Sequence, residues 1–192
     1  MSSQLPPLKI SCTSSDCESG LHCFKATRAL IQGNQQGACR SCGARLVDWD
    51  RVHGCRVDDA DFTFAALQFE LIRHHFWHVA FDERALNHAF RKGRTRLYEA
   101  ASRRLETSVS KAADAYDGRQ TPFTGNTIYF AQHAVAACCR TCIEYWHGID
   151  KSRDLTESEL AYLHKLVTRY LDQRLPDLSA EPRLVPRRMQ AS

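Results

Sequence analysis

The stretch that decides this sequence runs from residue 117 to residue 149 and reads DGRQTPFTGNTIYFAQHAVAACCRTCIEYWHGI. Behind a turn-rich loop it gathers metal-ligating residue types, namely His133, Cys138, Cys139, Cys142 and His147. Cys139 and Cys142 have the Cys-x-x-Cys spacing of a metal knuckle, and a histidine lies on each side of it. We therefore predict a His/Cys metal site in this stretch.

Other interpretations of the same residues stay open. Free cysteine packs as a small hydrophobe, so a helix of buried cysteines beside unrelated histidines would have the same composition. Cys-Cys and Cys-x-x-Cys pairs also occur in thiol redox chemistry, and three nearby cysteines could ligate an iron–sulfur cluster. If residues 134–147 are helical, Cys138 and Cys142 share one face and Cys139 does not, unless the knuckle lies at a helix start.

The same stretch carries a family resemblance. The motifs DGRQTPFTG, AQHA, CCRTC and EYWHGI, in this order, resemble the domain of unknown function 4186 family. The resemblance extends from about Phe62 to Leu175. It implies one compact domain and no particular activity.

Composition narrows the class of protein. The chain has 192 residues, of which 43% are hydrophobic and 25% charged, with a net charge of +4. This is enough apolar material for a core, and no apolar run approaches the ~20 residues of a membrane span. The first residues, MSSQLPPLKI, lack the pattern of a secretory signal, so nine clustered cysteines favour metal ligation over disulfides. We expect a cytoplasmic protein without a membrane partner, of unassigned oligomeric state.

Residues 1–57 are predicted to form a small zinc ribbon with short β-hairpins. Its cysteines fall into two groups about twenty residues apart, which is typical of a ribbon that clamps one ion. The favoured ligands are Cys12, Cys17, Cys39 and Cys42, with Cys23 or its neighbour His22 as a substitute. A structural ion can contribute about 10 kcal/mol to folding such a unit, and four ligands leave no open position for catalysis.

Residues 58–178 are predicted to form a mainly α domain on which the ribbon packs. Glu70, His74 and His78 are spaced four apart, so on a helix they would share one face as acid–base groups or metal ligands, or simply pack there. A helix from Asp82 is expected to end at Gly93, and a capping box predicts another helix near Thr156. Residues 179–192 are expected to be a flexible basic tail.

The densest basic cluster lies on the helices predicted around Gly93. Its members are Arg91, Lys92, Arg94, Arg96, Arg103 and Arg104. Guanidinium groups pair well with phosphate oxygens, and aromatic side chains can stack on bases, although a charge run is also the usual solvated face of a helix.

Three functions fit these patterns. The first is a protein that binds one or two zinc ions and binds nucleic acid through its basic helices. The second is a metal-dependent hydrolase or repair-type enzyme acting on nucleic acid or nucleotides, with His133 and Gln132 near the metal and Glu70, His74 or His78 as acid–base groups. The third is an interaction module for a protein partner, with structural metals only.

Overall fold

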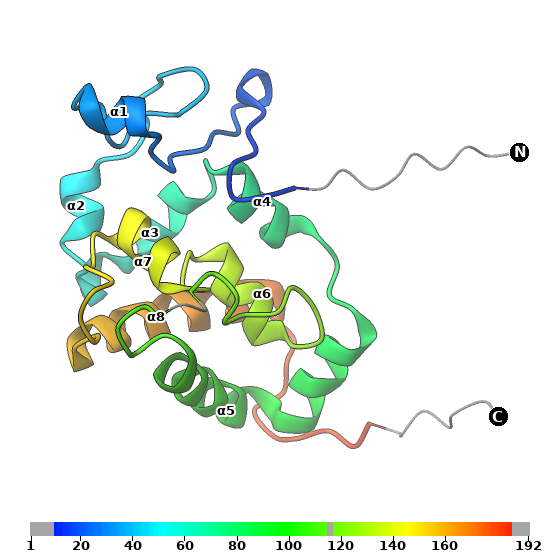
Figure 1. Cartoon of the computed structure of the whole chain (residues 1–192). Coiled ribbons are helices and arrows are strands. Elements are labelled where there is room, and N and C mark those ends of the chain that lie inside the picture. Colours follow the sequence, from blue (N-terminus) through cyan, green and yellow to red (C-terminus); the bar gives the residue numbers. More distant parts are fainter. Residues whose placement is uncertain (1–9, 115–116, 186–192) are drawn as a thin grey trace, which may run out of the picture.

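The computed structural model describes residues 10–114 and 117–185, and these are mainly helical (Figure 1). Two 3-10 helices, η1 (Cys17–Ser19) and η2 (Val57–Asp59), accompany the α-helices. The α-helices are α1 (Arg28–Gln32), α2 (Trp49–His53), α3 (Ala60–Leu67), α4 (Leu71–His78), α5 (Glu83–Ser108), α6 (Thr127–Ala134), α7 (Arg140–His147) and α8 (Glu157–Arg174). The prediction of a mainly α protein is confirmed.

The short strands expected of a zinc ribbon are not formed. Across the described residues, strand-type pairing is limited to two isolated bridges, Asp16 with Leu21 and His22 with Glu70. The chain reverses at Gly20 and Gly43, both in the left-handed region with φ of 74° and 78°. The cysteine-rich part is instead built from loops and short helices.

Helix α6 lies in the middle of the helical domain and packs against α4, α5 and α8 (Figure 1). Its sequence, TIYFAQHA, is apolar around most of its circumference, which is the pattern of a helix buried on all sides. Ile128, Phe130, Ala131 and Ala134 are buried, and the two alanines let neighbouring helices approach closely. The loop before α6 and the turn after it are thereby fixed relative to the core.

Helix α5 contains the break that the sequence predicts at Gly93. Gly93 has φ 66° and ψ 169°, so the helix kinks there. A Cβ at this position would lie 2.5 Å from the carbonyl carbon of Glu181, and the next amide, of Arg94, donates to the Ser179 carbonyl at 2.8 Å. The first residues of the predicted tail therefore lie against α5, while residues 186–192 fall outside the described part of the chain.

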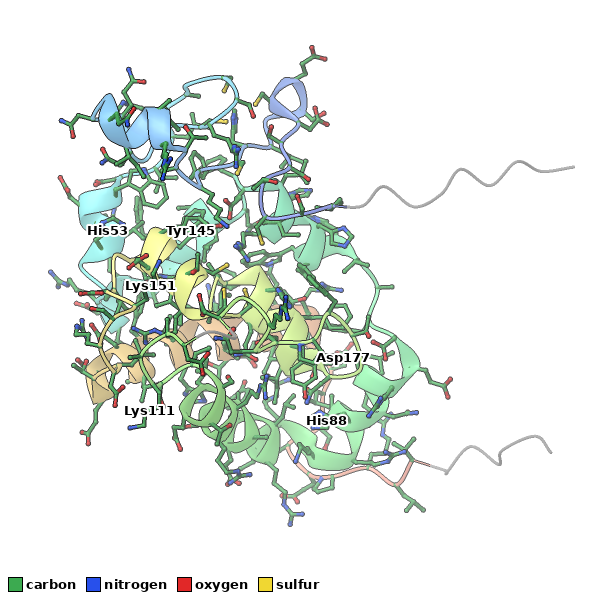
Figure 2. All side chains as sticks on the ribbon, in the orientation of Figure 1. His53, His88, Lys111, Tyr145, Lys151 and Asp177 are labelled. Carbon is green, nitrogen blue, oxygen red and sulfur yellow. The ribbon has the colours of Figure 1, made fainter. Side chains whose placement is uncertain are left out.

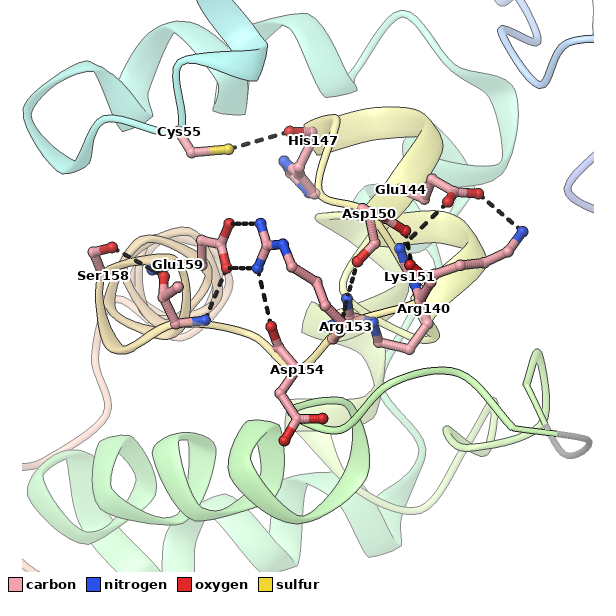
Figure 3. A network of polar contacts seen from close by, with 12 residues as sticks. Cys55, Arg140, Glu144, His147, Asp150, Lys151, Arg153, Asp154, Ser158 and Glu159 are labelled. Atoms are coloured by element: carbon pink, nitrogen blue, oxygen red, sulfur yellow. Dashed lines mark hydrogen bonds and ion pairs between the residues drawn. The ribbon is translucent and has the colours of Figure 1, made fainter.

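A buried arginine holds the connection between α7 and α8 (Figure 3). Arg140 donates to the carbonyl oxygens of Val109, Asp150 and Arg153 at 3.1, 2.8 and 3.0 Å. These carbonyl groups lie outside helices and strands, so no backbone N–H of a described regular element pairs with them. The guanidinium of Arg140 donates the hydrogen bonds instead. The loop then enters α8 through an ion pair of 2.6 Å between Arg153 and Glu159, and the predicted capping box is formed.

The cysteine-rich N-terminal part is seated on the helical domain. The amide of Leu71, at the start of α4, donates to the His22 carbonyl at 2.9 Å. The rings of Phe24 and Trp49 pack on buried Trp146 of α7, with centroids 5.8 and 5.1 Å away. Aromatic packing and backbone hydrogen bonds together fix the orientation of the cysteine loops above α4 and α7.

Candidate metal centres and a basic groove

The first candidate metal centre lies within the N-terminal part. The ligand atoms of Cys17, His22, Cys39 and Cys42 all lie within 4.8 Å of one another. The sulfurs of Cys17 and Cys39 are 3.7 Å apart, and the Cys42 sulfur is 3.5 Å from Nδ1 of His22. Tetrahedral zinc, with its ordinary bond lengths, holds such atoms about 3.5–3.8 Å apart. The four side chains could therefore hold one ion.

The local backbone favours the thiolate form of Cys39 but not that of Cys17. Burial raises the pKa of Cys39, but amides of Cys23, Cys42 and Ser41 outweigh it and lower the pKa to about 6. Burial and contacts with the thiols of Cys42 and Cys39 raise the pKa of Cys17 to about 11. Crowded thiolates repel one another, so a cation is required to keep all of them deprotonated together.

The fourth member of this centre differs from the favoured prediction. His22, named as a substitute, lies where Cys12 was expected. The bridge between His22 and Glu70 holds the histidine over the cysteine loops, whereas Cys12 lies in a segment that runs beside α4 (Figure 1). The other proposed substitute, Cys23, turns its thiol to the Cys12 carbonyl at 3.3 Å.

The second candidate centre lies where α7 begins. The sulfurs of Cys138, Cys139 and Cys142 are buried and within 4.8 Å of one another. Cys139 is the N-cap of α7, and its sulfur accepts the Cys142 amide at 3.4 Å. The knuckle thus sits at a helix start, so its thiols converge although a continuous helix would separate them.

A buried cation faces two of these thiols. Both terminal nitrogens of Arg73 approach them, with Nη2 3.4 Å from the Cys142 sulfur and Nη1 4.0 Å from the Cys138 sulfur. The Nε atom of Arg73 pairs with Glu70 at 2.9 Å, and neither side chain is exposed to solvent. The sequence analysis missed Arg73, although a lone arginine in the otherwise apolar and histidine-rich stretch LIRHHFW is a usable signal.

The structure does not bring His133 and His147 to the thiols. Nε2 of His133 is 3.2 Å from the carbonyl oxygens of Thr121 and Pro122. Nε2 of His147 is 3.0 Å from the Val135 carbonyl. Carbonyl oxygens only accept hydrogen bonds, so each Nε2 carries a proton and holds a backbone turn. Both histidines are engaged by the loops that flank α6.

The predicted acid–base face on α4 is divided between core and surface. Glu70 precedes the helix with φ −92° and ψ 127°, and its buried carboxylate accepts the Trp146 indole at 2.6 Å. His74 and His78 stack at 4.0 Å on the outside of α4. The four-residue spacing places groups on one face only inside a helix, and Glu70 lies just before it.

Two of the predicted basic residues, and Gln132, serve the fold. Arg94 forms an ion pair of 2.7 Å with Asp172 of α8. Arg104 donates to the Gln120 carbonyl and, at 3.3 Å, to the side chain of Gln132, which is fully buried. These contacts tie α5 to α8 and to the loop before α6. Arg96 and Arg103 remain exposed on α5.

The remaining pair of predicted basic residues lines a groove between α5 and the loop before α6. The groove encloses about 690 Å³. Its lining consists of Arg84, His88, Arg91, Lys92, Pro122, Thr124, Gly125, Asn126 and Tyr129. Three of these residues are cationic and none has a carboxylate. Asn126 is the N-cap of α6, so the positive end of that helix dipole also lies at the groove.

A family model described as a domain of unknown function (DUF4186) matches residues 61–172, well over half of the chain. The chain belongs to this family. The basic groove and the Cys138–Cys142 cluster fall inside the matched segment, whereas the Cys17–Cys42 cluster precedes it. The comparison with solved structures found no match. Within the described residues, no helix combines the length and the apolar content needed to cross a membrane.

Proposed function

We propose that this is a zinc-binding protein that holds nucleic acid in the groove between α5 and the loop before α6. The observation that carries the proposal is the composition of the groove, which has three cationic side chains and no carboxylate in its lining. Phosphate contacts supply most of the sequence-independent affinity for nucleic acid. They require cationic side chains that can reach the phosphate oxygens.

The positions of the cations suit a phosphate backbone. Arg84 precedes Arg91 by seven residues and Lys92 by eight on α5, which is about two helical turns, so their head groups line one side of the groove. Arg84 and Arg91 are exposed and therefore accessible to a ligand. On the opposite side, the amide end of α6 favours negative charge. Tyr129 adds an aromatic ring against which a base can stack.

Zinc is the ion that best suits the first candidate centre. Three sulfurs and one imidazole nitrogen at tetrahedral spacing match the ligand preference of zinc. All four positions would be filled, so the ion would act structurally. We infer that it fixes the N-terminal loops, which contain few apolar residues for a core of their own.

The enzyme alternative has less support. A hydrolytic metal site needs an open coordination position with an acid–base group nearby. The residues named for that role are dispersed, because His133 and His147 engage backbone carbonyls and Glu70 is paired inside the core. A module for a protein partner would require no such groove.

The proposal is tested by measuring the affinity of the full chain for labelled single-stranded and duplex oligonucleotides by fluorescence anisotropy. Between 50 and 200 mM salt, three phosphate contacts predict a slope of log affinity against log salt of about −2 to −3. Arg91→Ala and Lys92→Ala should each weaken binding and reduce that slope by about 1.

Lys111→Ala is the matched control. Lys111 is an exposed lysine outside the groove lining, and it lies to the left of His88 in Figure 2. Its loss removes the same charge, and its surface ion pair with Asp154 contributes little to stability. No binding at 50 mM salt, or groove variants that bind as well as Lys111→Ala, would overturn the proposal. Binding of free nucleotides alone would restrict the ligand to a small phosphate compound and contradict it equally.

A further inference from the structure

We propose that Cys12 completes a second zinc site with Cys138, Cys139 and Cys142, so that one ion ties the N-terminal segment to the helical domain. This site is separate from the Cys17–Cys42 centre and from the basic groove. The inference does not depend on nucleic-acid binding.

The contacts among the thiols carry the inference. Cys142 is the common partner, because its side chain interacts with those of Cys12, Cys138 and Cys139. The three thiols of the helical domain already lie within 4.8 Å of one another. Cys12 precedes the three other cysteines by at least 126 residues. Its contact with Cys142 is therefore a tertiary contact that local sequence spacing does not produce.

The number of the sulfurs and the closeness of the three on the helical domain suit a single ion. Four thiolates around tetrahedral zinc have sulfurs about 3.8 Å apart, and a set of four cysteines is an ordinary ligand set for structural zinc. An iron–sulfur cluster inserts several irons and bridging sulfides, which spreads its four cysteines farther apart than contact between thiols allows. The described cysteines are all free thiols, so none of the four is consumed by a disulfide.

The surroundings provide what a buried thiolate site needs. Zinc with four thiolates has a net charge of −2, and Arg73 directs two nitrogens at the sulfurs of Cys142 and Cys138 from 3.4 and 4.0 Å. The Cys142 amide donates to the Cys139 sulfur at 3.4 Å. Hydrogen bonds from outside the ligand set orient metal ligands and disperse their charge. Glu70 keeps the guanidinium in place through a bond of 2.9 Å to its Nε.

The position of Cys12 is also fixed from the N-terminal side. Its carbonyl oxygen accepts the Cys23 thiol at 3.3 Å, which holds the backbone of Cys12 against the cysteine loops. Four protein sulfurs would leave the ion no open position. The second site would therefore act as a structural clamp between two parts of the chain, and a water-activating role is not part of the proposal.

The test measures zinc per chain in the full-length protein by elemental mass spectrometry, before and after a graded chelator challenge. We expect two zinc ions for the wild type and one for Cys142→Ser. Cys12→Ser should lose its second ion at a chelator concentration that leaves the wild type loaded. Cys55→Ser is the matched control, because Cys55 is a half-buried thiol outside both clusters that donates to the His147 carbonyl.

Cobalt substitution supplies an independent readout of the ligand count. The thiolate-to-cobalt absorption of the second ion should fall by about a quarter in Cys12→Ser and remain unchanged in Cys55→Ser, since absorption follows the number of bound thiolates. Should Cys142→Ser fail to fold by circular dichroism, Cys12→Ser still decides the matter, because Cys12 precedes every helix of the described chain.

Three results would overturn the inference. They are a wild type with one zinc per chain, a Cys12→Ser variant that retains zinc as firmly as Cys55→Ser, and an iron–sulfur absorption spectrum in the protein as purified. Failure of oligonucleotide binding would leave the zinc count unchanged, so the two proposals fail separately.

Discussion

His133 and His147 illustrate how burial changes the role of a residue. The ring of His133 lies between those of Phe76 and Phe123, with both centroids 4.6 Å away and near-parallel planes. Burial, with a smaller contribution from Arg73, lowers the pKa of His133 to about 4. Burial likewise lowers the pKa of His147 to about 4. Both are neutral hydrogen-bond donors inside the fold, although their sequence positions suggested metal ligation.

We expect the two histidines to make stability depend on pH. In the unfolded chain each protonates near its ordinary pKa of about 6.5, whereas in the fold each stays neutral down to about 4. The unfolded state therefore binds protons first, so their stabilising contribution is complete above pH 6.5 and declines as the pH falls toward 4. At pH 5 the loss is about 2 kcal/mol for each histidine.

Urea unfolding at pH 7, 6 and 5 measures this dependence. His133→Gln and His147→Gln should each make stability less dependent on pH than it is in the wild type. All variants are compared at the same zinc load, because thiolate protonation adds a common pH effect. An unchanged slope in both buried variants would contradict the assignment.

At the scale of elements, a single glycine in α5 allows residues 179–183 to pack against that helix. The backbone of Gly93, at φ 66° and ψ 169°, is in a region that only glycine occupies readily. The kink opens one side of the helix to residues 179–183, where the Arg183 amide donates to the Phe90 carbonyl at 2.7 Å. Residues 179–183 are thus held by backbone contacts that a continuous helix would exclude.

We expect Gly93→Ala to lower the free energy of unfolding by about 1–3 kcal/mol from backbone strain alone, and further because its Cβ would meet the Glu181 backbone at 2.5 Å. In limited proteolysis, Gly93→Ala should also be cleaved faster than the wild type near residue 180. Gly118→Ala is the control, since Gly118 has φ 91° but open space around it. Equal destabilisation and equal cleavage in the two variants would show that the close contact is unimportant.

Across the whole molecule, Glu70 connects the N-terminal part with the helical domain. Its carboxylate accepts the Phe24 amide at 3.3 Å from one side and the Trp146 indole at 2.6 Å from the other. It also pairs with Arg73 and accepts the Tyr145 hydroxyl at 2.9 Å. With no exposure to solvent, this carboxylate satisfies groups from three separate stretches of chain.

Glu70→Gln should destabilise the protein by about 3–5 kcal/mol, because it removes one partner of the buried Glu70–Arg73 ion pair. Asp58→Asn removes an acid from an exposed pair with Arg56, whose side chain is 67% exposed, and should have little effect on stability. Chemical denaturation gives both values, and hydrogen exchange should show the Phe24 amide losing protection only in Glu70→Gln. A cost for Glu70→Gln no larger than that for Asp58→Asn would refute this role.

The sequence by itself determined the features that depend on neighbouring residues. Helix α8 and its capping box, the break at Gly93 and the knuckle at Cys139 and Cys142 follow from spacing, capping and backbone preference. The likeness of residues 117–149 to the DUF4186 family was likewise visible in order and spacing, and the family model confirms it.

Only the tertiary structure decided which distant groups meet. In the folded chain His22 lies beside Cys17, and Cys12 lies beside Cys142. Arg73 contacts the thiol of Cys142. Arg91 and the loop before α6 line one groove. These pairings depend on how α4, α5 and α6 pack, and each buried polar group adopts the partner that packing brings within reach. Residue spacing cannot specify that outcome, because contacts between distant segments are selected by burial of the whole core.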